Sequence, residues 1–139
     1  MKNKKSKIIT LLAVAAASLL MLFTLTACGA APYQARYDAI RNAFNTDTAW
    51  TVADEGLTVG TGDNIVTATH AFRATNVTNT NDSVRVFLFA NSNYANTARD
   101  YLRENSTDIP QRSGNMVIVG TEAAVYFVNA VLAATIDAE

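Results

Sequence analysis

The sequence contains few of the residues on which most enzyme chemistry depends. Its 139 residues include one cysteine, Cys28, and one histidine, His70, and all four lysines lie within the first seven positions. A single cysteine excludes a disulfide within the chain and any metal site that needs several thiolates. The absence of lysine after Lys7 excludes lysine nucleophiles from the rest of the chain. The composition therefore leaves few routes to covalent or metal-assisted catalysis.

The first 28 residues have the layout of an export signal. The lysine-rich start is followed by an uncharged apolar run from Ile8 to Leu25, and then by the small residues Thr26 and Ala27 before Cys28. A run of this length could just cross a hydrocarbon core of about 30 Å, so an uncleaved signal anchor is the competing interpretation. A plain transmembrane helix, however, has no physical reason to end in leucine, two small residues and cysteine.

The quartet Leu25-Thr26-Ala27-Cys28 resembles the lipobox of bacterial lipoproteins. The resemblance implies cleavage between Ala27 and Cys28, and a thioether link from the Cys28 thiol to a diacylglycerol whose acyl chains, palmitate among them, anchor the protein. It implies a location on the extracytoplasmic face of the cell membrane. The resemblance covers the leader and Cys28 alone, and residues 33–139 suggest no particular family.

Three segments follow from this interpretation: a signal peptide over 1–27, the lipidated cysteine with a short tether over 28–32, and a single globular domain over 33–139. Removal of the leader leaves 112 residues, enough for one domain with its own core. The four residues between Cys28 and the first predicted helix, 29–32, reach at most about 15 Å. The domain is therefore expected to stay close to the bilayer, which favours a membrane-proximal protein partner.

The chain after the leader is acidic. It carries seven arginines against all twelve carboxylate residues, a formal charge of −5. This sign argues against nucleic acid as a partner and against electrostatic adhesion to anionic lipid head groups. The diacylglycerol on Cys28 would then be the sole attachment to the membrane.

Hydrophobic periodicity predicts the order α-β-β-β-α-β-α, in which the first β stands for the segment 49–60. Tyr33, Tyr37, Ile40 and Phe44 recur with helical spacing and predict a helix over 33–45. The remaining predictions are two short strand pieces within 49–60, strands over 65–76, 84–90 and 116–120, and helices over 93–104 and 122–136. The first of these helices could be capped by Ser92 or Asn93.

This order predicts an α+β fold with a mainly antiparallel sheet of about four strands and about three helices on one or both faces. Strand 84–90 is nearly all apolar, so we expect both of its faces to be covered. Alternation within 65–76 directs His70 toward the core and Ala71 toward solvent. Residues 105–115, with Pro110 and Gly114, are predicted to be a loop. As an alternative, the segments 84–90, 93–104 and 116–120 could form a right-handed crossover with one parallel strand pair.

A serine-based catalytic site would have to use His70. The candidate nucleophiles are Ser83, Ser92, Ser106 and Ser113. The Gly-x-Ser-x-Gly elbow of the hydrolases does not occur, and a hydrogen-bonded core or edge histidine is the simpler interpretation.

A carboxylate pair is the other catalytic possibility, since two acidic groups suffice for glycoside hydrolysis. The candidates are Asp54, Glu55, Asp63, Asp82, Asp100, Glu104 and Asp108. Their spacing selects no pair. Asp63 and Asn64 could bind Ca²⁺ weakly, but a turn built from glycine and aspartate explains them better. No cofactor and no metal site is predicted.

Function is expected to follow from location rather than from chemistry. The main hypothesis is a non-catalytic accessory or binding lipoprotein that contacts a partner near the membrane. A carboxylate-based cell-wall hydrolase is the first alternative. The second is a small-ligand binder, in which Trp50 and Tyr94 would line a pocket instead of filling the core.

Overall fold

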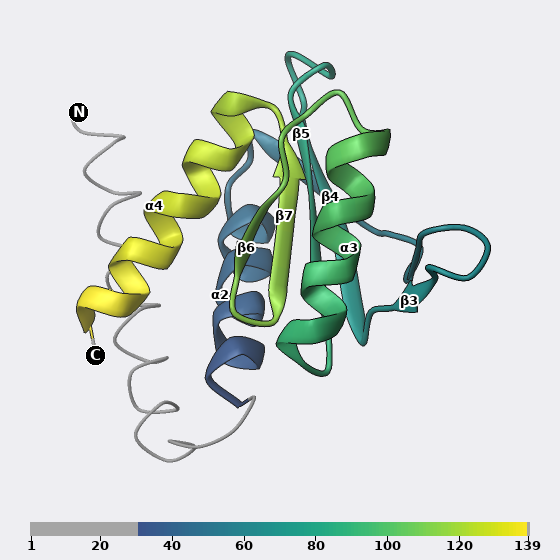
Figure 1. Cartoon of the computed structure of the whole chain (residues 1–139). Coiled ribbons are helices and arrows are strands. Elements are labelled where there is room, and N and C mark those ends of the chain that lie inside the picture. The colour runs from purple at the N-terminus through teal and green to yellow at the C-terminus, as the bar shows by residue number, and fades with distance from the viewer. Residues whose placement is uncertain (1–30, 139) are drawn as a thin grey trace, which may run out of the picture.

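A five-stranded antiparallel sheet lies between helices on both of its faces (Figure 1). The computed structural model describes residues 31–138. In chain order the elements are α2 (Ala31–Thr46), β1 (Trp50–Asp54), β2 (Thr58–Val59), β3 (Val66–Thr67), β4 (His70–Asn76), β5 (Ser83–Leu88), α3 (Ser92–Asn105), β6 (Gln111–Ser113), β7 (Met116–Gly120) and α4 (Glu122–Ala138). The strand order is β1-β4-β5-β7-β6, and β2 with β3 forms a separate two-stranded sheet. The predicted α+β class is confirmed, with a slightly larger sheet than expected.

Helices α2 and α4 cover one face of the sheet. The predicted apolar stripe of α2 is buried there, with Tyr37, Ile40 and Phe44 at most 1% exposed. They pack against alternate residues of the strands, among them Phe72 and Val86. The apolar residues at helical spacing on α2 and the alternate residues of the strands thus pack together in one apolar layer.

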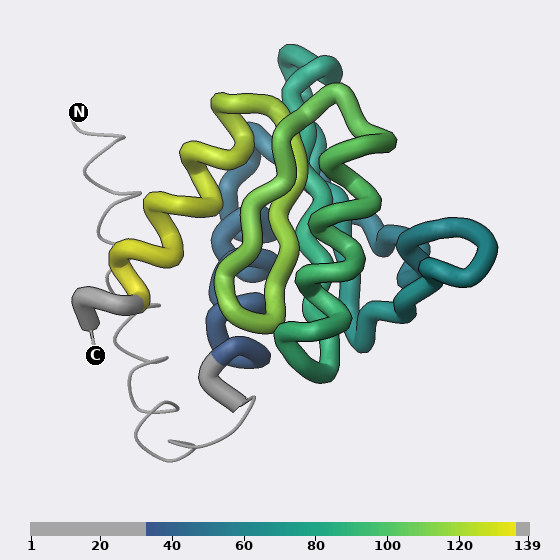
Figure 2. The backbone as a smooth tube through the Cα atoms, viewed as in Figure 1, coloured from purple at the N-terminus to yellow at the C-terminus, as the bar shows by residue number. Residues whose placement is uncertain are grey.

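Helix α3 and the β2–β3 hairpin cover part of the opposite face. Phe87 of β5 and Phe89, which follows this strand, pack there with Ala95, Ala98 and Leu102 of α3. The hairpin projects from the side of the domain (Figure 2). Since Val86 and Leu88 face the α2 layer, the second half of β5 is covered on both faces, as its apolar sequence predicts.

The segment expected to be a loop contains an additional strand. Gln111–Ser113 forms β6 and pairs with β7 in a tight hairpin whose turn places Gly114 at φ +58°. This short polar strand brings β7 back antiparallel to β5, with Val86 opposite Ile118. The parallel pair considered from the sequence is therefore wrong, because β7 follows a hairpin turn and not a crossover.

The segment 65–76 is two strands and not one. It is interrupted at Ala68 and Thr69, and His70 at the start of β4 is exposed while Ala71 is buried. The predicted inward His70 and outward Ala71 are both wrong, because Ala71 lies under the α3 layer. The α3 cap also differs from the prediction, since the Asn91 side chain accepts the hydrogen bond from the Tyr94 N–H.

Candidate functional site

The predicted lipidation and cleavage residues, Cys28 and Ala27, lie outside the described residues, as does the leader over 1–27. Helix α2 already begins at Ala31, so the last two residues of the expected tether are helical. Within residues 31–138, no helix is long and apolar enough to cross a membrane.

His70 is exposed at the start of β4. Its Nδ1 lies 3.1 Å from the Thr69 Oγ1, and its ring centre lies 5.5 Å from that of Tyr37. None of the four candidate serines hydrogen-bonds His70 within the described part of the chain. Ser106 instead accepts a hydrogen bond from the Asp108 N–H. The exposed histidine is thus a surface residue at the end of a strand.

The adjacent carboxylates of Asp54 and Glu55 bind arginines of different elements. The Asp54 carboxylate receives a 2.7 Å hydrogen bond from Arg41 of α2. The Glu55 carboxylate instead receives hydrogen bonds from Arg73 of β4. Each of these two carboxylates neutralises an arginine, and they do not converge on a common cleft.

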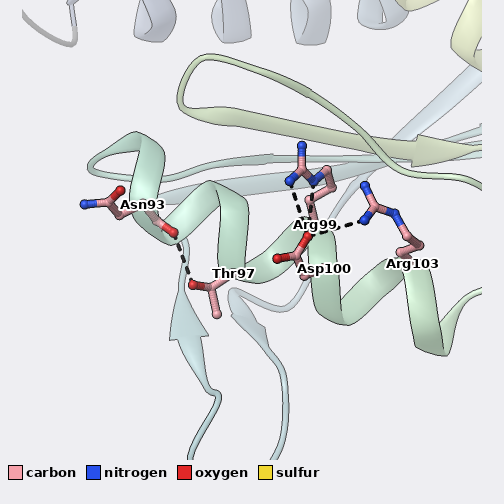
Figure 3. A network of polar contacts seen from close by, with 5 residues as sticks. All are labelled: Asn93, Thr97, Arg99, Asp100 and Arg103. Carbon is pink, nitrogen blue, oxygen red and sulfur yellow. Dashed lines mark hydrogen bonds and ion pairs between the residues drawn. The ribbon is translucent and has the colours of Figure 1, made fainter.

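The other candidate carboxylates occupy exposed or partly exposed positions. On α3, Asp100 lies between Arg99, 3.3 Å away, and Arg103, 3.6 Å away, and Thr97 hydrogen-bonds the Asn93 carbonyl one turn earlier (Figure 3). Asp82 accepts a hydrogen bond from Asn79 in the β4–β5 turn. Exposed ion pairs of this kind contribute little to the free energy of unfolding. Among residues 31–138, no three histidine, cysteine or acidic side chains could hold a metal ion together.

Trp50 belongs to the core rather than to a pocket. Its ring centre lies 5.1 Å from that of Phe44 and 5.9 Å from that of Phe127. Tyr94, by contrast, is 47% exposed on the first turn of α3. The two aromatic residues considered for ligand stacking therefore lie on opposite sides of the sheet, since Trp50 belongs to the α2 layer.

One part of the sheet remains open, on the side that carries α3. Side chains of β1, β4 and β5 that point to this side form a patch with Glu55, which follows β1, and we call this patch the arginine face: Thr51, Ala53, Glu55, Arg73 and Arg85. Thr51, Ala53 and Arg73 are exposed. Arg73 and Arg85 stand directly opposite each other on neighbouring strands, and Ala53 is the β1 partner of Arg73.

Glu55 holds the two arginines together. The Arg73 Nε lies 3.1 Å from one carboxylate oxygen and its Nη2 lies 3.4 Å from the other. Arg85 lies 3.9 Å from the second oxygen and also stacks over the Phe87 ring at 5.8 Å. Like charges directly opposite on paired strands repel, so a single carboxylate offsets two guanidinium groups and leaves one positive charge in excess.

A second polar cluster lies between α2 and the sheet. The Tyr37 hydroxyl is buried and has no hydrogen-bond partner among the described residues. Burial raises the pKa of the Tyr37 phenol, and the nearby Arg41 guanidinium opposes this rise. The hydrogen bond to Asp54 raises the pKa of Arg41 above its ordinary value. The ion pair between Arg41 and Asp54 connects α2 to β1.

The chain matches no protein-family model, no curated protein and no solved structure.

The arginine face could not be located from composition or spacing. Arg73 reads from the sequence as an outward residue of one strand, and Arg85 as a polar interruption of an apolar run. Their proximity depends on the register of the β4–β5 hairpin, in which Ser83 pairs with Thr75. The signal that could have found it is the position of the two arginines, each six residues from Asn79 at the centre of the polar turn.

Proposed function

We propose that the protein is a membrane-anchored extracytoplasmic lipoprotein that acts as a non-catalytic accessory or binding module for a partner near the membrane. The arginine face carries this proposal. It is an open patch with an unbalanced positive charge on an otherwise acidic domain, and it offers recognition without a nucleophile or an acid–base pair.

The direction of the strands supports an orientation relative to the bilayer. The N-termini of α2 and α3 and the β6–β7 turn lie at one end of the sheet, which we call the tether end (Figure 1). At this end the Tyr33 ring lies against Gly114 of the turn. Two residues separate Cys28 from α2, so a lipid on Cys28 would hold the tether end against the membrane surface.

Charge is distributed in a way that suits this orientation. The opposite end contains the β4–β5 turn, the C-terminus of α3 and the N-terminus of α4. Its carboxylates are Asp47, Asp82, Glu104, Asp108 and Glu122. The tether end carries Arg36 and Arg112, and the carboxylates nearest to it, Asp54 and Glu55, are paired with arginines. Anionic lipid head groups would repel the acidic end, so the same orientation is favoured electrostatically.

The alternatives receive less support from the geometry. A cell-wall hydrolase needs two carboxylates in one cleft, whereas Asp54 and Glu55 are bound to arginines of separate elements. A small-ligand binder would need Trp50 in a pocket wall, whereas Trp50 packs on Phe44 and Phe127.

Photo-crosslinking in cells tests the proposal. Amine-directed reagents have no lysine target after Lys7, so a photoreactive amino acid is placed at Ala53 on the arginine face and, as a control, at Ala130 on the exposed side of α4. We expect Ala53, but not Ala130, to yield a protein adduct in the membrane fraction. Equal adducts at the two positions, or none at Ala53, would contradict a membrane-proximal partner on the arginine face.

A further inference from the structure

Strand β1 presents a free edge whose unpaired backbone groups can be assigned. The Glu55 N–H donates to the Ala71 carbonyl and the Val77 N–H donates to the Ala49 carbonyl. In an antiparallel ladder, hydrogen-bonded pairs alternate with pairs that form no bonds to each other. Thr51 and Ala53 therefore bond to β4, whereas the N–H and C=O groups of Val52 and Asp54 point outward.

This edge lacks the usual protection against pairing with another chain. The five residues of β1 include no proline and no lysine, and the carboxylate of its single charged residue, Asp54, is paired with Arg41 of α2. Within residues 31–138, no hydrogen bond occupies the outward groups of Val52. The other edge of the sheet, β6, is only three residues long. A long, regular edge with unpaired groups is a template for an added strand.

The arginine face adds a chemical preference to the edge. Neighbouring strands lie about 4.8 Å apart, so a strand added beyond β1 would lie about 9.6 Å from β4. Ala53 is the β1 residue directly opposite Arg73, and its methyl group leaves the path across β1 open. Arg73, with its side chain 45% exposed, could therefore reach a carboxylate on the added strand.

Arg85 makes this exchange favourable. Its guanidinium lies 3.9 Å from the Glu55 carboxylate, and this side chain donates no hydrogen bond among the described residues. When Arg73 turns to an incoming carboxylate, Glu55 can remain paired with Arg85. The site then holds two carboxylates and two guanidinium groups, and its excess positive charge is gone.

We propose that β1 receives an extended segment of a partner protein as a sixth strand, and that an acidic side chain of this segment binds Arg73. The inference rests on the proposed binding function and names the surface and the chemistry of the partner. A second copy of the chain fits less well, because the carboxylate that it would bring to this side, that of its own Glu55, is already paired with Arg73 and Arg85 of the same copy.

The test uses the full-length lipoprotein in detergent micelles and a defined probe. The probe is a blocked five-residue peptide of alternating threonine and valine with one central glutamate, and its control has glutamine in place of glutamate. Hydrogen exchange is followed by NMR at the amides of β1. Without peptide, we expect the Val52 and Asp54 amides to exchange rapidly and the Thr51 and Ala53 amides to be protected.

Addition of the glutamate peptide should slow exchange at Val52 and Asp54 in a saturable way. The glutamine peptide and the Arg73→Gln variant should each weaken binding about fivefold or more. Arg103→Gln, which removes the same charge from the exposed surface of α3, should bind as the unmodified protein does. The amide spectra show directly whether each variant is folded.

Three results would overturn the inference: unchanged exchange at Val52 and Asp54 with the glutamate peptide, equal binding of the two peptides, or protection of both amides by dimerisation without peptide. Membrane fractionation of the same full-length chain separates this inference from the proposed function. Peptide binding by a chain that does not fractionate with membranes would refute the anchored function and leave the β1 site standing. An anchored chain with no response at β1 would refute the site alone.

Discussion

Arg73 and Arg85 face each other across β4 and β5, and the Glu55 carboxylate contacts both guanidinium groups. Two positive charges at directly opposite positions of a sheet destabilise it unless an anion lies between them. Glu55 comes from the residue that follows β1, so this one side chain connects three strands. The arginine face therefore stabilises the sheet through Glu55, and it also carries one positive charge in excess.

Glu55→Gln should lower the free energy of unfolding by about 1–2 kcal/mol, because it removes the anion from between the two arginines. Denaturant unfolding measures the change. Combining it with Arg85→Gln should recover part of the loss, since one of the opposed charges is then removed. A stability unaffected by Glu55→Gln would show that solvent alone screens the arginine pair.

Tyr37→Phe should change stability by less than about 1 kcal/mol at neutral pH, because the buried hydroxyl has no hydrogen-bond partner among residues 31–138. Burial raises the pKa of Tyr37 in the folded state above the ordinary value of 10.0. Above pH 10 the unfolded chain therefore loses this proton first, and stability falls with rising pH up to the folded-state pKa. The phenylalanine variant should lose less stability over this range in denaturant titrations, and identical alkaline profiles would contradict the assignment.

Gly120→Ala should destabilise the domain by about 2–3 kcal/mol, because a Cβ at this position would meet the backbone of Ser83 and Val84 on β5. Gly56→Ala is the matched control, since nothing lies within 4 Å of a Cβ there. We expect the control to be neutral or slightly stabilising in thermal unfolding. Equal effects of the two variants would argue against the close β5–β7 approach.

Phe44→Ala should cost about 3–5 kcal/mol, because Phe44 is fully buried and stacks on Phe127 at 4.3 Å. It should also alter the fluorescence of the single tryptophan, Trp50, whose ring lies next to it. Tyr126→Ala, at a site 76% exposed on the outer side of α4, should change neither property measurably. Unfolding monitored by circular dichroism and by fluorescence provides both readouts.

The elements with strong periodicity could be predicted from the sequence, and those defined by tertiary context could not. Helical spacing alone predicts the buried side of α2, which carries Tyr37, Ile40 and Phe44. Three polar residues give no such signal for β6, which exists because β7 pairs with it. Ala71 is buried only because α3 covers it, and the single-face alternation expected for 65–76 assigned it to solvent. For the candidate site, the sequence shows each arginine, but their positions opposite each other follow only from the register of β4 and β5.

The intact mass of the protein extracted from the membrane fraction of its native host tests the central claim most directly. The account predicts a chain that begins at Cys28 and carries the mass of a diacylglycerol, with fragmentation placing the added mass on that residue. The Cys28→Ala form should retain residues 1–27, so the membrane fraction should contain no mature chain of this form. A wild-type chain that keeps its leader, or one that starts at Cys28 without added lipid, would contradict the anchored function.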